Sequence, residues 1–345
     1  MESPESWFHR KATFYVEAQI LFHLNQAGVF KLLNGGGSYT AREIADSLHL
    51  EPGPADALLD YVFEVDDLLD RDQENKYSLS EFGRKVIGRY SDMKADASRQ
   101  SINMFDVRVG AYGPVWQNLG RMLSGDGRYG QDFHREGRYA ENGVFKLAMN
   151  FWNSLVEHVD ELGVDSVLEV GLTTGLVEKL AERYPDHVLY GLDRSESALE
   201  SNASSAAAKG IRNISWIRSD FFDLDGWRGR VDSDRRGLIF SLHFHELMAK
   251  GEERFVEVLR GLKTTHPNWA VVAFEQPRMP HVDKGNISET LWLYSQSNIL
   301  IHHLIGNGRI LSRDAWMDLG YQAGCRKVSD RACNYLGYRA FVFEL

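Results

Sequence analysis

Residues 167–175 read VLEVGLTTG, and this stretch decides the fold class of the chain. An apolar run leads into a turn with glycines at positions 171 and 175, and a second apolar run, HVLYGLD, ends at Asp193. The order is that of a strand, a glycine turn, a helix and a second strand that ends in an acid. In an open α/β sheet, this arrangement is typical of a site that binds a nucleoside through its ribose hydroxyls.

The pattern continues as an alternation of strands and helices. We expect strands at 166–170, 187–192, 214–217, 237–242 and 270–274, and helices at 176–184, 196–209 and 255–262. Units of this length predict an α/β fold, a Rossmann-like domain with a mostly parallel seven-stranded sheet and helices on both faces. The last run, YLGYRAFVFEL, has no helix after it and is expected to close the sheet as an antiparallel edge hairpin.

The N-terminal region has a different pattern, that of a mostly helical module. Apolar residues recur at helical spacing over 14–33, Thr40 precedes Glu43 as in a capping box, and a further helix is expected at 55–65, followed by two short strands around a polar turn. Three helices and a two-stranded wing predict a winged helix. The helix at 55–65 has no Lys or Arg for phosphate contacts, which favours a dimerisation domain, and hence a homodimer, over DNA binding.

Three regions follow from these patterns. They are a winged-helix dimerisation domain at 1–94, a helical connector at 95–160 and the Rossmann-like domain at 161–345. The connector is rich in aromatic residues, and we expect it to roof the active site, because apolar small-molecule sites often lie between domains.

The composition disfavours some classes of function. A formal net charge of −10 disfavours nucleic acid as a partner, because affinity for phosphate backbones comes mainly from clustered Lys and Arg. The apolar stretches are of strand length, and the first residues lack the pattern of a signal peptide, so no membrane span and a cytoplasmic location are expected. The two cysteines, Cys325 and Cys333, are interpreted as packing residues.

From the winged-helix module to Leu345, the chain resembles the class I S-adenosylmethionine-dependent methyltransferases of the small-molecule O-methyltransferase type. The first motif of that family has an acid and three glycines at alternate positions. Here those positions hold Glu169, Gly171, Thr173 and Gly175, so Thr replaces the middle glycine. Its Cβ and hydroxyl would come close to the methionine part of the cofactor, where they could weaken binding or add a hydrogen bond.

The same resemblance implies further cofactor contacts. Asp193 matches the acid that binds both ribose hydroxyls, and Asp220 and Phe221 match the positions that contact adenine. Each residue also has a purely structural interpretation, in a tight turn or at a helix cap. S-adenosylmethionine is therefore the expected cofactor, because the glycine motif, Asp193 and the pair Asp220 and Phe221 occur in the order that the family has.

Chemistry is expected at the end of the fourth strand, where GLIFSL is followed by HFHE. This places His243, His245 and Glu246 at the carboxyl edge of the sheet, where open α/β sheets bind ligands. The resemblance implies that His245 removes a proton from the substrate and that Glu246, at a position where the family has Asp, holds the imidazole in one tautomer. Glu275, at the end of the fifth strand, is expected to orient the acceptor or to bond to His245.

A second pair of imidazoles, His302 and His303, lies in a helix-like segment that lines the substrate site in the family. If one of them faces the fourth strand, it could form an Fe or Zn site with His245, with the carboxylate of Glu246 and with His243 as a further candidate ligand. The bacterial α-keto acid C-methyltransferases, a related branch, resemble this chain in having a His from each of these two places. The alternative is that these histidines are packed core residues, and adjacent helical residues point about 100° apart, so at most one would reach a metal.

These observations predict an S-adenosylmethionine-dependent methyltransferase of secondary metabolism. The first expectation is C-methylation at C3 of an aromatic or branched 2-oxo acid through a metal-stabilised enolate, because two histidine pairs exceed the need of a single general base. The alternative is metal-independent O-methylation with His245 as the base. A third hypothesis is a protein that keeps the fold without methyl transfer, a non-methylating protein or a winged-helix regulator, and Thr173 is the feature that favours it.

Overall fold

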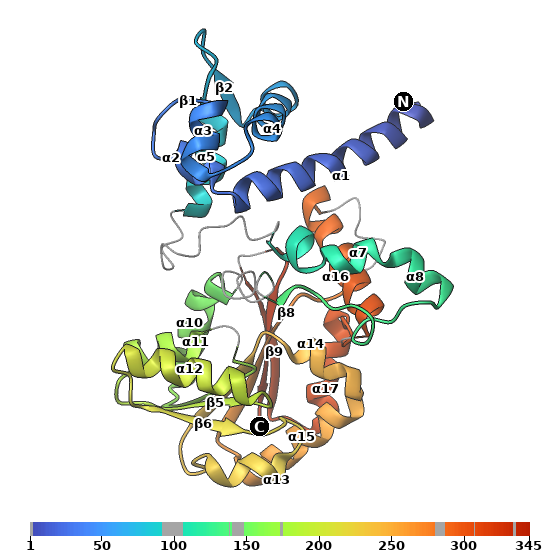
Figure 1. The fold of residues 1–345 in the computed structure, drawn as a ribbon. Helices are drawn as coiled ribbons and strands as arrows, with labels where there is room; N and C mark the ends of the chain where they lie inside the picture. Colours follow the sequence, from blue (N-terminus) through green and yellow to red (C-terminus); the bar gives the residue numbers. More distant parts are fainter. Residues whose placement is uncertain are drawn as a thin grey trace. The chain divides into compact units, whose positions relative to one another are not determined.

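The computed structural model describes residues 3–91, 106–137, 139, 148–172, 175–279, 287–306, 308–333 and 336–345. The chain divides into two compact units, Met1–Gly143 and Val144–Leu345 (Figure 1). The division falls within the segment predicted as a connector, whose position above the site stays a prediction. Thr173, the departure from the glycine motif, lies outside the described residues.

The first unit is helical with a small sheet. Its elements are α1 (Pro4–Gln26), α2 (Val29–Asn34), β1 (Tyr39–Thr40), α3 (Ala41–Leu48), α4 (Pro52–Val65), β2 (Leu69–Arg71), β3 (Lys76–Leu79), α5 (Glu81–Ser91), the π-helix η1 (Asp106–Ala111), α7 (Gly113–Gln117) and α8 (Leu119–Ser124). The strands pair antiparallel in the order β1-β3-β2. The predicted hairpin and the helix at 55–65 are confirmed, and the name winged helix and the dimerisation role stay predictions.

Two local features of this unit follow directly from the sequence. The capping box is present, because Thr40 Oγ1 accepts from the Glu43 amide at 3.2 Å and the Glu43 carboxylate accepts from the Thr40 amide at 2.7 Å. The single helix predicted over 14–33 is wrong. The helix ends at Gln26 and a new one begins at Val29, because Gly28 adopts a left-handed backbone with φ of 87°, which other residues disfavour.

The second unit is an α/β unit built on seven strands. Its strands are β4 (Ser166–Val170), β5 (Val188–Asp193), β6 (Ile214–Arg218), β7 (Gly237–Ser241), β8 (Trp269–Glu275), β9 (Lys327–Ala332) and β10 (Arg339–Glu344). Its helices are α10 (Trp152–Leu162), α11 (Leu176–Arg183), α12 (Glu196–Ala208), α13 (Leu224–Trp227), η2 (Arg228–Arg230), α14 (Phe244–Leu247), η3 (Met248–Lys250), α15 (Glu252–Thr265), α16 (Glu289–Ile305) and α17 (Arg313–Ala323). Among the described residues, no helix is long and apolar enough to cross a membrane.

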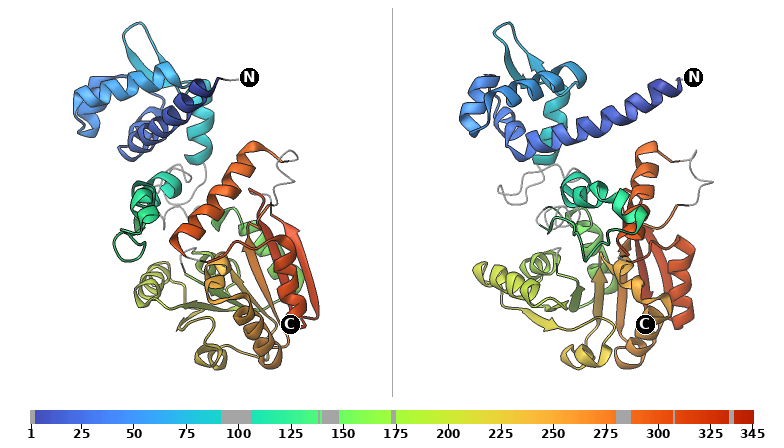
Figure 2. Two further views of the ribbon diagram at one scale, coloured as in Figure 1. Left: turned by 90° about the vertical axis from the view of Figure 1, so that its right-hand side faces the viewer. Right: turned by 45° about the vertical axis from the view of Figure 1, so that its right-hand side comes forward.

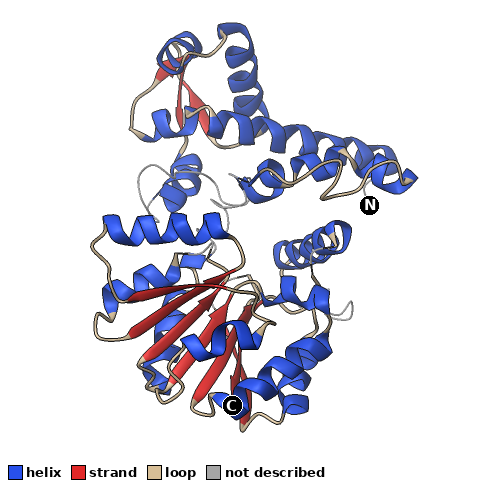
Figure 3. Ribbon diagram, turned by 60° about the horizontal axis from the view of Figure 1, so that its bottom comes forward, coloured by secondary structure: helices blue, strands red, loops and turns tan. Residues whose placement is uncertain are grey.

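The strand order in the sheet is β6-β5-β4-β7-β8-β10-β9. The first five of these are parallel, and β10 runs antiparallel to both β8 and β9. The predicted mostly parallel seven-stranded sheet with a terminal antiparallel hairpin is thus confirmed. Figure 3 shows the sheet with helices on both of its faces, as parallel strands require.

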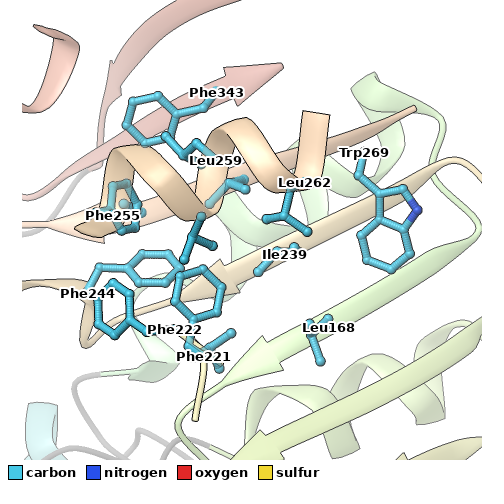
Figure 4. Packing of buried hydrophobic residues seen from close by; sticks show 14 of the residues in the cluster. Leu168, Phe221, Phe222, Ile239, Phe244, Phe255, Leu259, Leu262, Trp269 and Phe343 are labelled. Atoms are coloured by element: carbon cyan, nitrogen blue, oxygen red, sulfur yellow. The ribbon is translucent and has the colours of Figure 1, made fainter. Parts of the chain in front are cut away.

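Two apolar layers hold this unit together, one on each face of the sheet. Along β4, Val167 packs into one layer and Leu168 into the other, as the alternation of side chains along a strand dictates. One layer combines the sheet with α15 and α17 through residues such as Phe255 and Phe343, and Figure 4 shows this packing. Every residue of β4, β7 and β8 is buried, so the central strands form a rigid base for the loops that follow them.

The direction of the chain across the sheet reverses at β4. From β4 the chain adds β5 and β6 on one side and later returns to add β7 and β8 on the other. Open α/β sheets bind ligands outside the carboxyl ends of the strands at such a point. The turn after β4, Asp193 and the HFHE segment after β7 all lie at this edge. Figure 2 shows α16, drawn in orange, running past the ends of the strands rather than along a face of the sheet.

Candidate active site

The turn after β4 is glycine-dependent. Gly171 has a φ of 83°, and a Cβ at this position would lie 3.2 Å from Cδ2 of His243. Gly175, with a φ of 63°, is the N-cap of α11. The turn is anchored on both sides, because the Leu172 amide donates to Asp193 at 3.0 Å and its carbonyl accepts from Asn202 of α12 at 2.9 Å. His243 therefore lies directly against the turn.

Glu169 is buried beneath this turn. One carboxylate oxygen, Oε2, accepts from the Val177 amide at 2.9 Å, which ties β4 to the start of α11. Among the described residues, Oε1 has no hydrogen-bond partner. Burial raises the pKa of Glu169 to about 8. A buried carboxylate oxygen without a partner is suited to a donor that arrives with a ligand, such as an ammonium group.

Asp193 ends β5 and is half-buried. Its Oδ2 accepts from Leu172, and its Oδ1 accepts from the Ser195 amide at 2.8 Å. These bonds fix the carboxylate at the sheet edge. Each oxygen retains a further lone pair, so both can still accept from the hydroxyls of a ribose.

Asp220 and Phe221 follow β6 and differ in exposure. The Asp220 carboxylate forms ion pairs with Lys250 and Arg194, and its Oδ1 accepts from the Phe222 amide at 3.0 Å. Burial alone would raise the pKa of Asp220, but the Lys250 ammonium and the Phe222 amide outweigh it and lower this pKa. The Phe221 ring is only 2% exposed and stacks on Trp227. Figure 4 shows Phe221 in the core beside Phe222 and Phe244. The predicted contact of Phe221 with adenine stays a prediction.

The HFHE segment is held to the sheet by its backbone. Ser241, the last residue of β7, donates its hydroxyl to the Val170 carbonyl at 2.8 Å and accepts from the His243 amide at 2.9 Å. The chain then turns into the short helix α14. These bonds place His243 and His245 at the junction of β4, β7 and β8.

His245 forms a buried pair with Glu275, the last residue of β8. The two oxygens of Glu275 accept from the backbone amide of His245 at 2.9 Å and contact its Nδ1 at 2.7 Å. Glu275 is 1% exposed and His245 9% exposed. An ionised carboxylate only accepts hydrogen bonds, so Nδ1 carries the proton and Nε2 keeps the lone pair. This is the tautomer that a general base needs.

The structure places Glu275 at Nδ1 of the His245 ring, because the end of β8 lies beside the end of β7 in the parallel sheet. Of the two parts expected of Glu275, the bond to His245 is the one observed. Glu246 is half-buried in α14, and a catalytic part for it stays a prediction.

The two histidines of α16 face different ways. His302 is 6% exposed, and its ring contacts that of His245 edge to face, with the centroids 4.5 Å apart and the planes at 77°. His303 is exposed. The centroid of the His243 ring is 6.3 Å from that of the His245 ring. The structure thus brings the rings of His243 and His302 near that of His245, and leaves His303 exposed.

The loop after α16 packs against the backbone of the HFHE segment. The Arg309 amide donates to the His245 carbonyl at 2.9 Å. Gly308 has a φ of 94°, and a Cβ here would lie 2.0 Å from the same carbonyl oxygen. Further along, the Arg278 amide donates to the Leu311 carbonyl at 2.7 Å, which ties the loop to the segment after β8. These contacts fix the end of α16, and with it His302, beside His245.

The metal site stays a prediction. In the described parts of the chain, no three His, Cys, Asp or Glu side chains converge as a group that could hold a metal ion. Of the four predicted ligands, His245 and His302 are in ring contact and His303 is turned away. The described residues therefore supply two imidazoles at one place but not the full set of ligands of an Fe or Zn site.

Sequence reasoning missed several residues that build this site. Lys250 and Arg194 neutralise Asp220, and Gly308 and Arg309 fix the end of α16. The basic residues have no local signal, because their partner is distant in the sequence. Gly308 lies in the stretch GNGR after a long apolar helix, and a glycine at such a place was the available signal for a close backbone approach.

Comparison with known proteins bears on the fold. No protein-family model and no curated protein matches the sequence. Solved structures do match over the whole chain. Human N-acetylserotonin methyltransferase in complex with S-adenosylmethionine is 16% identical, with a TM-score of 0.67 and 99% of each chain covered. PigF with S-adenosylhomocysteine is 16% identical, with a TM-score of 0.70 and 100% of each chain covered.

The fold is that of the class I S-adenosylmethionine-dependent O-methyltransferases. Mitomycin 7-O-methyltransferase shares this methyltransferase fold, at 15% identity and a TM-score of 0.65, with 99% of this chain and 98% of the other covered. The sequence-based resemblance is thus confirmed at the level of the fold. The resemblance to the metal-dependent branch stays a prediction.

Proposed function

We propose that this protein transfers the methyl group of S-adenosylmethionine to a hydroxyl oxygen of a small molecule, with His245 as the general base. The observation that carries the proposal is the buried His245–Glu275 pair, 2.7 Å between Nδ1 and Oε2, at the same sheet edge as the glycine turn and Asp193. A base, its orienting carboxylate and a nucleoside-binding edge are the parts that such a transfer needs.

The residues at this edge fit the cofactor. Asp193 offers two fixed carboxylate oxygens to a ribose, and Gly171 leaves room beside His243. Oε1 of Glu169, which has no partner in the part of the chain that the structure describes, suits a buried ammonium group. Asp220 stays ionised beside Lys250 and can accept from an amino group. When bound, S-adenosylmethionine supplies an electrophilic methyl group on sulfur.

His245 acts on the acceptor. Its Nε2 accepts the hydroxyl proton as the acceptor oxygen forms its bond to the methyl carbon and the bond from sulfur to that carbon breaks. Glu275 stabilises the resulting imidazolium and keeps the ring oriented. Because His245 is almost fully buried, the charge pair forms away from bulk water, where it interacts more strongly than at the surface.

A methyl-transfer assay tests this proposal. The purified protein is incubated with S-adenosylmethionine carrying a labelled methyl group and a panel of phenols and enols, and labelled product is measured. We expect transfer by the wild type, a loss of roughly 10²-fold or more in His245→Ala, and no loss in His303→Ala, the exposed neighbour of His302. Transfer that is equally fast in His245→Ala would contradict the assignment of the base.

A second candidate, C-methylation at C3 of an α-keto acid, is favoured by one observation. The ring contact of His245 with His302 places two imidazoles, typical Fe or Zn ligands, at one point. We place this candidate second, although the sequence alone favoured it, because the described residues offer no group of three ligands. Stoichiometric Fe or Zn in the purified protein, with activity lost to a chelator, would reverse the order.

The first unit has a proposed role of its own, homodimerisation. The support is the apolar surface of α1, where large side chains are between 45% and 69% exposed. These residues are Trp7, Phe8, Phe14, Tyr15 and Val16. Contiguous exposed apolar residues commonly mark protein interaction sites. The remaining hypothesis, a non-methylating protein or a regulator, would be favoured by failure to bind S-adenosylmethionine or S-adenosylhomocysteine.

A further inference from the structure

Glu275 has a basic neighbour on the next strand of the sheet. In the register of β8 and β10, Glu275 lies directly opposite Arg339. Directly opposed residues of antiparallel strands carry their side chains on the same face, with Cβ atoms about 4.5–5.5 Å apart. The packing agrees, because Ala273 and Phe341, two residues from each of them, belong to the same apolar layer. A guanidinium group therefore lies near the carboxylate that orients the base.

In the described part of the chain, Arg339 is bound to a different carboxylate. Its Nε donates to Oδ2 of Asp330 on the edge strand β9. Asp330 lies on the same face of the sheet, because it is opposite Phe341 in the register of β9 and β10. Both oxygens of Glu275 are bonded to His245, one to its amide and one to Nδ1. Arg339 thus lies between two carboxylates and is paired with the outer one.

Asp330 is itself held in place. Arg313, the first residue of α17, donates to both of its oxygens, from Nε at 3.0 Å and from Nη2 at 2.7 Å. The side chain of Asp330 is only 4% exposed. The Arg313 guanidinium, together with that of Arg339, holds the pKa of Asp330 below its usual range. Asp330 is therefore a fixed and ionised acceptor for Arg339.

A change of partner by Arg339 would disturb the base. Guanidinium groups bind carboxylates through two parallel hydrogen bonds. In such a pair with Glu275, Arg339 would compete for the oxygens that bond to His245 and would offset the negative charge that stabilises the imidazolium. Both effects make Nε2 of His245 a weaker base.

We propose, on the basis of the proposed function, that Asp330 is a positioning residue that keeps Arg339 away from Glu275 and so reserves this carboxylate for His245. Asp330 acts through Arg339, from the edge strand of the sheet, two strands away from Glu275. Because its role is to hold a competitor, the loss of Asp330 should matter to His245 only while Arg339 is present.

Titration of the His245 ring by NMR tests this proposal without any substrate. The ring signals are assigned by their loss in His245→Gln, and the midpoint of their titration reports how strongly Glu275 stabilises the imidazolium. We expect Asp330→Asn to lower this midpoint by about one pH unit, because Arg339 then offsets the charge of Glu275. Addition of Arg339→Met to Asp330→Asn should restore the wild-type midpoint, and Arg339→Met alone should leave it unchanged.

The matched control is Glu344→Gln. Glu344 lies at the other end of β10, where it forms ion pairs with Arg326 and Lys327. Its substitution removes a comparable carboxylate from the same hairpin and should leave the midpoint unchanged. Asp330→Thr, whose side chain suits a strand, replaces Asp330→Asn in the comparison if that variant does not fold.

The outcomes separate this proposal from the proposed function. An unchanged midpoint in the Asp330 variant, a lowered midpoint that Arg339→Met does not restore, or an equal decrease in Glu344→Gln would each overturn the role of Asp330. These three results leave the proposed function standing, because methyl transfer tests it separately. A restored midpoint in a protein that transfers no methyl group would overturn the proposed function and retain the effect of Asp330 on the His245–Glu275 pair.

Discussion

Glu275 occupies a position where its charge is costly unless it is paired. It is 1% exposed, and both of its oxygens are bonded to His245, one to the backbone amide and one to the ring. A carboxylate without a partner would be strongly disfavoured at this burial. The pair therefore sets the ring orientation and the tautomer together, and a change of one atom at Glu275 should have a large effect.

The substitution Glu275→Gln tests this directly. The amide oxygen of Gln can still accept from the His245 amide, but its NH₂ group would face Nδ1, so the ring proton moves to Nε2 and the base is lost. We expect kcat to fall by roughly 10²- to 10⁴-fold, with unchanged affinity for S-adenosylhomocysteine. Kinetics and calorimetry measure the two quantities. Glu253→Gln, on the exposed side of α15, is the control. A near-normal kcat in Glu275→Gln would refute the role of Glu275 in setting the tautomer of His245.

Glu169 leads to a prediction about pH. Its pKa is raised by burial from 4.5 to about 8, so the folded protein binds a proton that the unfolded chain releases. The stability contribution of the protonated form is fully present below pH 4.5 and is lost as pH rises through about 8. In Glu169→Gln, which stays neutral and can still accept from Val177, this loss is absent. The free energy of unfolding of the variant, relative to the wild type, should therefore increase from pH 5 to pH 8.

Chemical denaturation of both proteins without ligand at several pH values measures this difference. Glu182→Gln, on the surface of α11, serves as the control and should follow the wild type. A free-energy difference between Glu169→Gln and the wild type that does not change with pH would show that Glu169 is ionised in the folded protein.

Most residues of the site could be named from the sequence, because they belong to short motifs at strand ends. Glu169 lies near the end of an apolar run, Asp193 ends one and His245 follows one, and the carboxyl ends of parallel strands meet at one edge. The orientation of His302 could not be predicted. Its distinction from His303 depends on the rotation of α16 about its axis, which is set by tertiary packing and by the loop at Gly308.

The attachment of α16 to the HFHE segment should depend on Gly308. A Cβ there would lie 2.0 Å from the His245 carbonyl oxygen, and the φ of 94° adds strain. Gly306 also has a positive φ, 61°, but a Cβ there meets nothing within 4 Å. The two glycines thus separate the effect of backbone strain from the effect of close packing.

We expect Gly306→Ala to lower the free energy of unfolding by about 1 kcal/mol through strain alone. Gly308→Ala should lower it by about 3 kcal/mol, because the loop must also move away from His245. Gly308→Ala should in addition lower kcat, since His302 and His245 shift together. Thermal unfolding of both variants measures the loss of stability, and steady-state kinetics measures kcat. Equal stability of the two variants would mean that the loop moves without cost.

The central strands were predicted to within one or two residues, because strands buried on both faces are continuous apolar runs. By contrast, α17 was not predicted, and the first strand of the terminal hairpin, β9, was not located in the sequence. β9, an edge strand, reads KVSDRA and is largely polar, so no apolar run marks it. The break between α1 and α2 was also missed, because the apolar spacing continues across Gly28 and only the left-handed backbone there ends the helix.

The proposed homodimer predicts the mass of the protein in solution. Sedimentation should give twice the mass of one chain for the wild type. Phe8→Glu with Tyr15→Glu, both on the exposed surface of α1, should shift the protein to the monomer, because charges are disfavoured at the centre of interfaces. Leu123→Glu, on the exposed Leu123 of α8, is the control. A monomeric wild type would refute the proposed dimer.

The central claim is that this sheet edge binds the nucleoside of S-adenosylmethionine. Isothermal titration with S-adenosylhomocysteine tests it most directly, with Asp193→Asn as the test variant and Asp186→Asn, at an exposed position, as the control. We predict one molecule bound per chain to the wild type and to Asp186→Asn, and at least tenfold weaker binding to Asp193→Asn. No binding by the wild type, or equal binding by Asp193→Asn, would contradict the account.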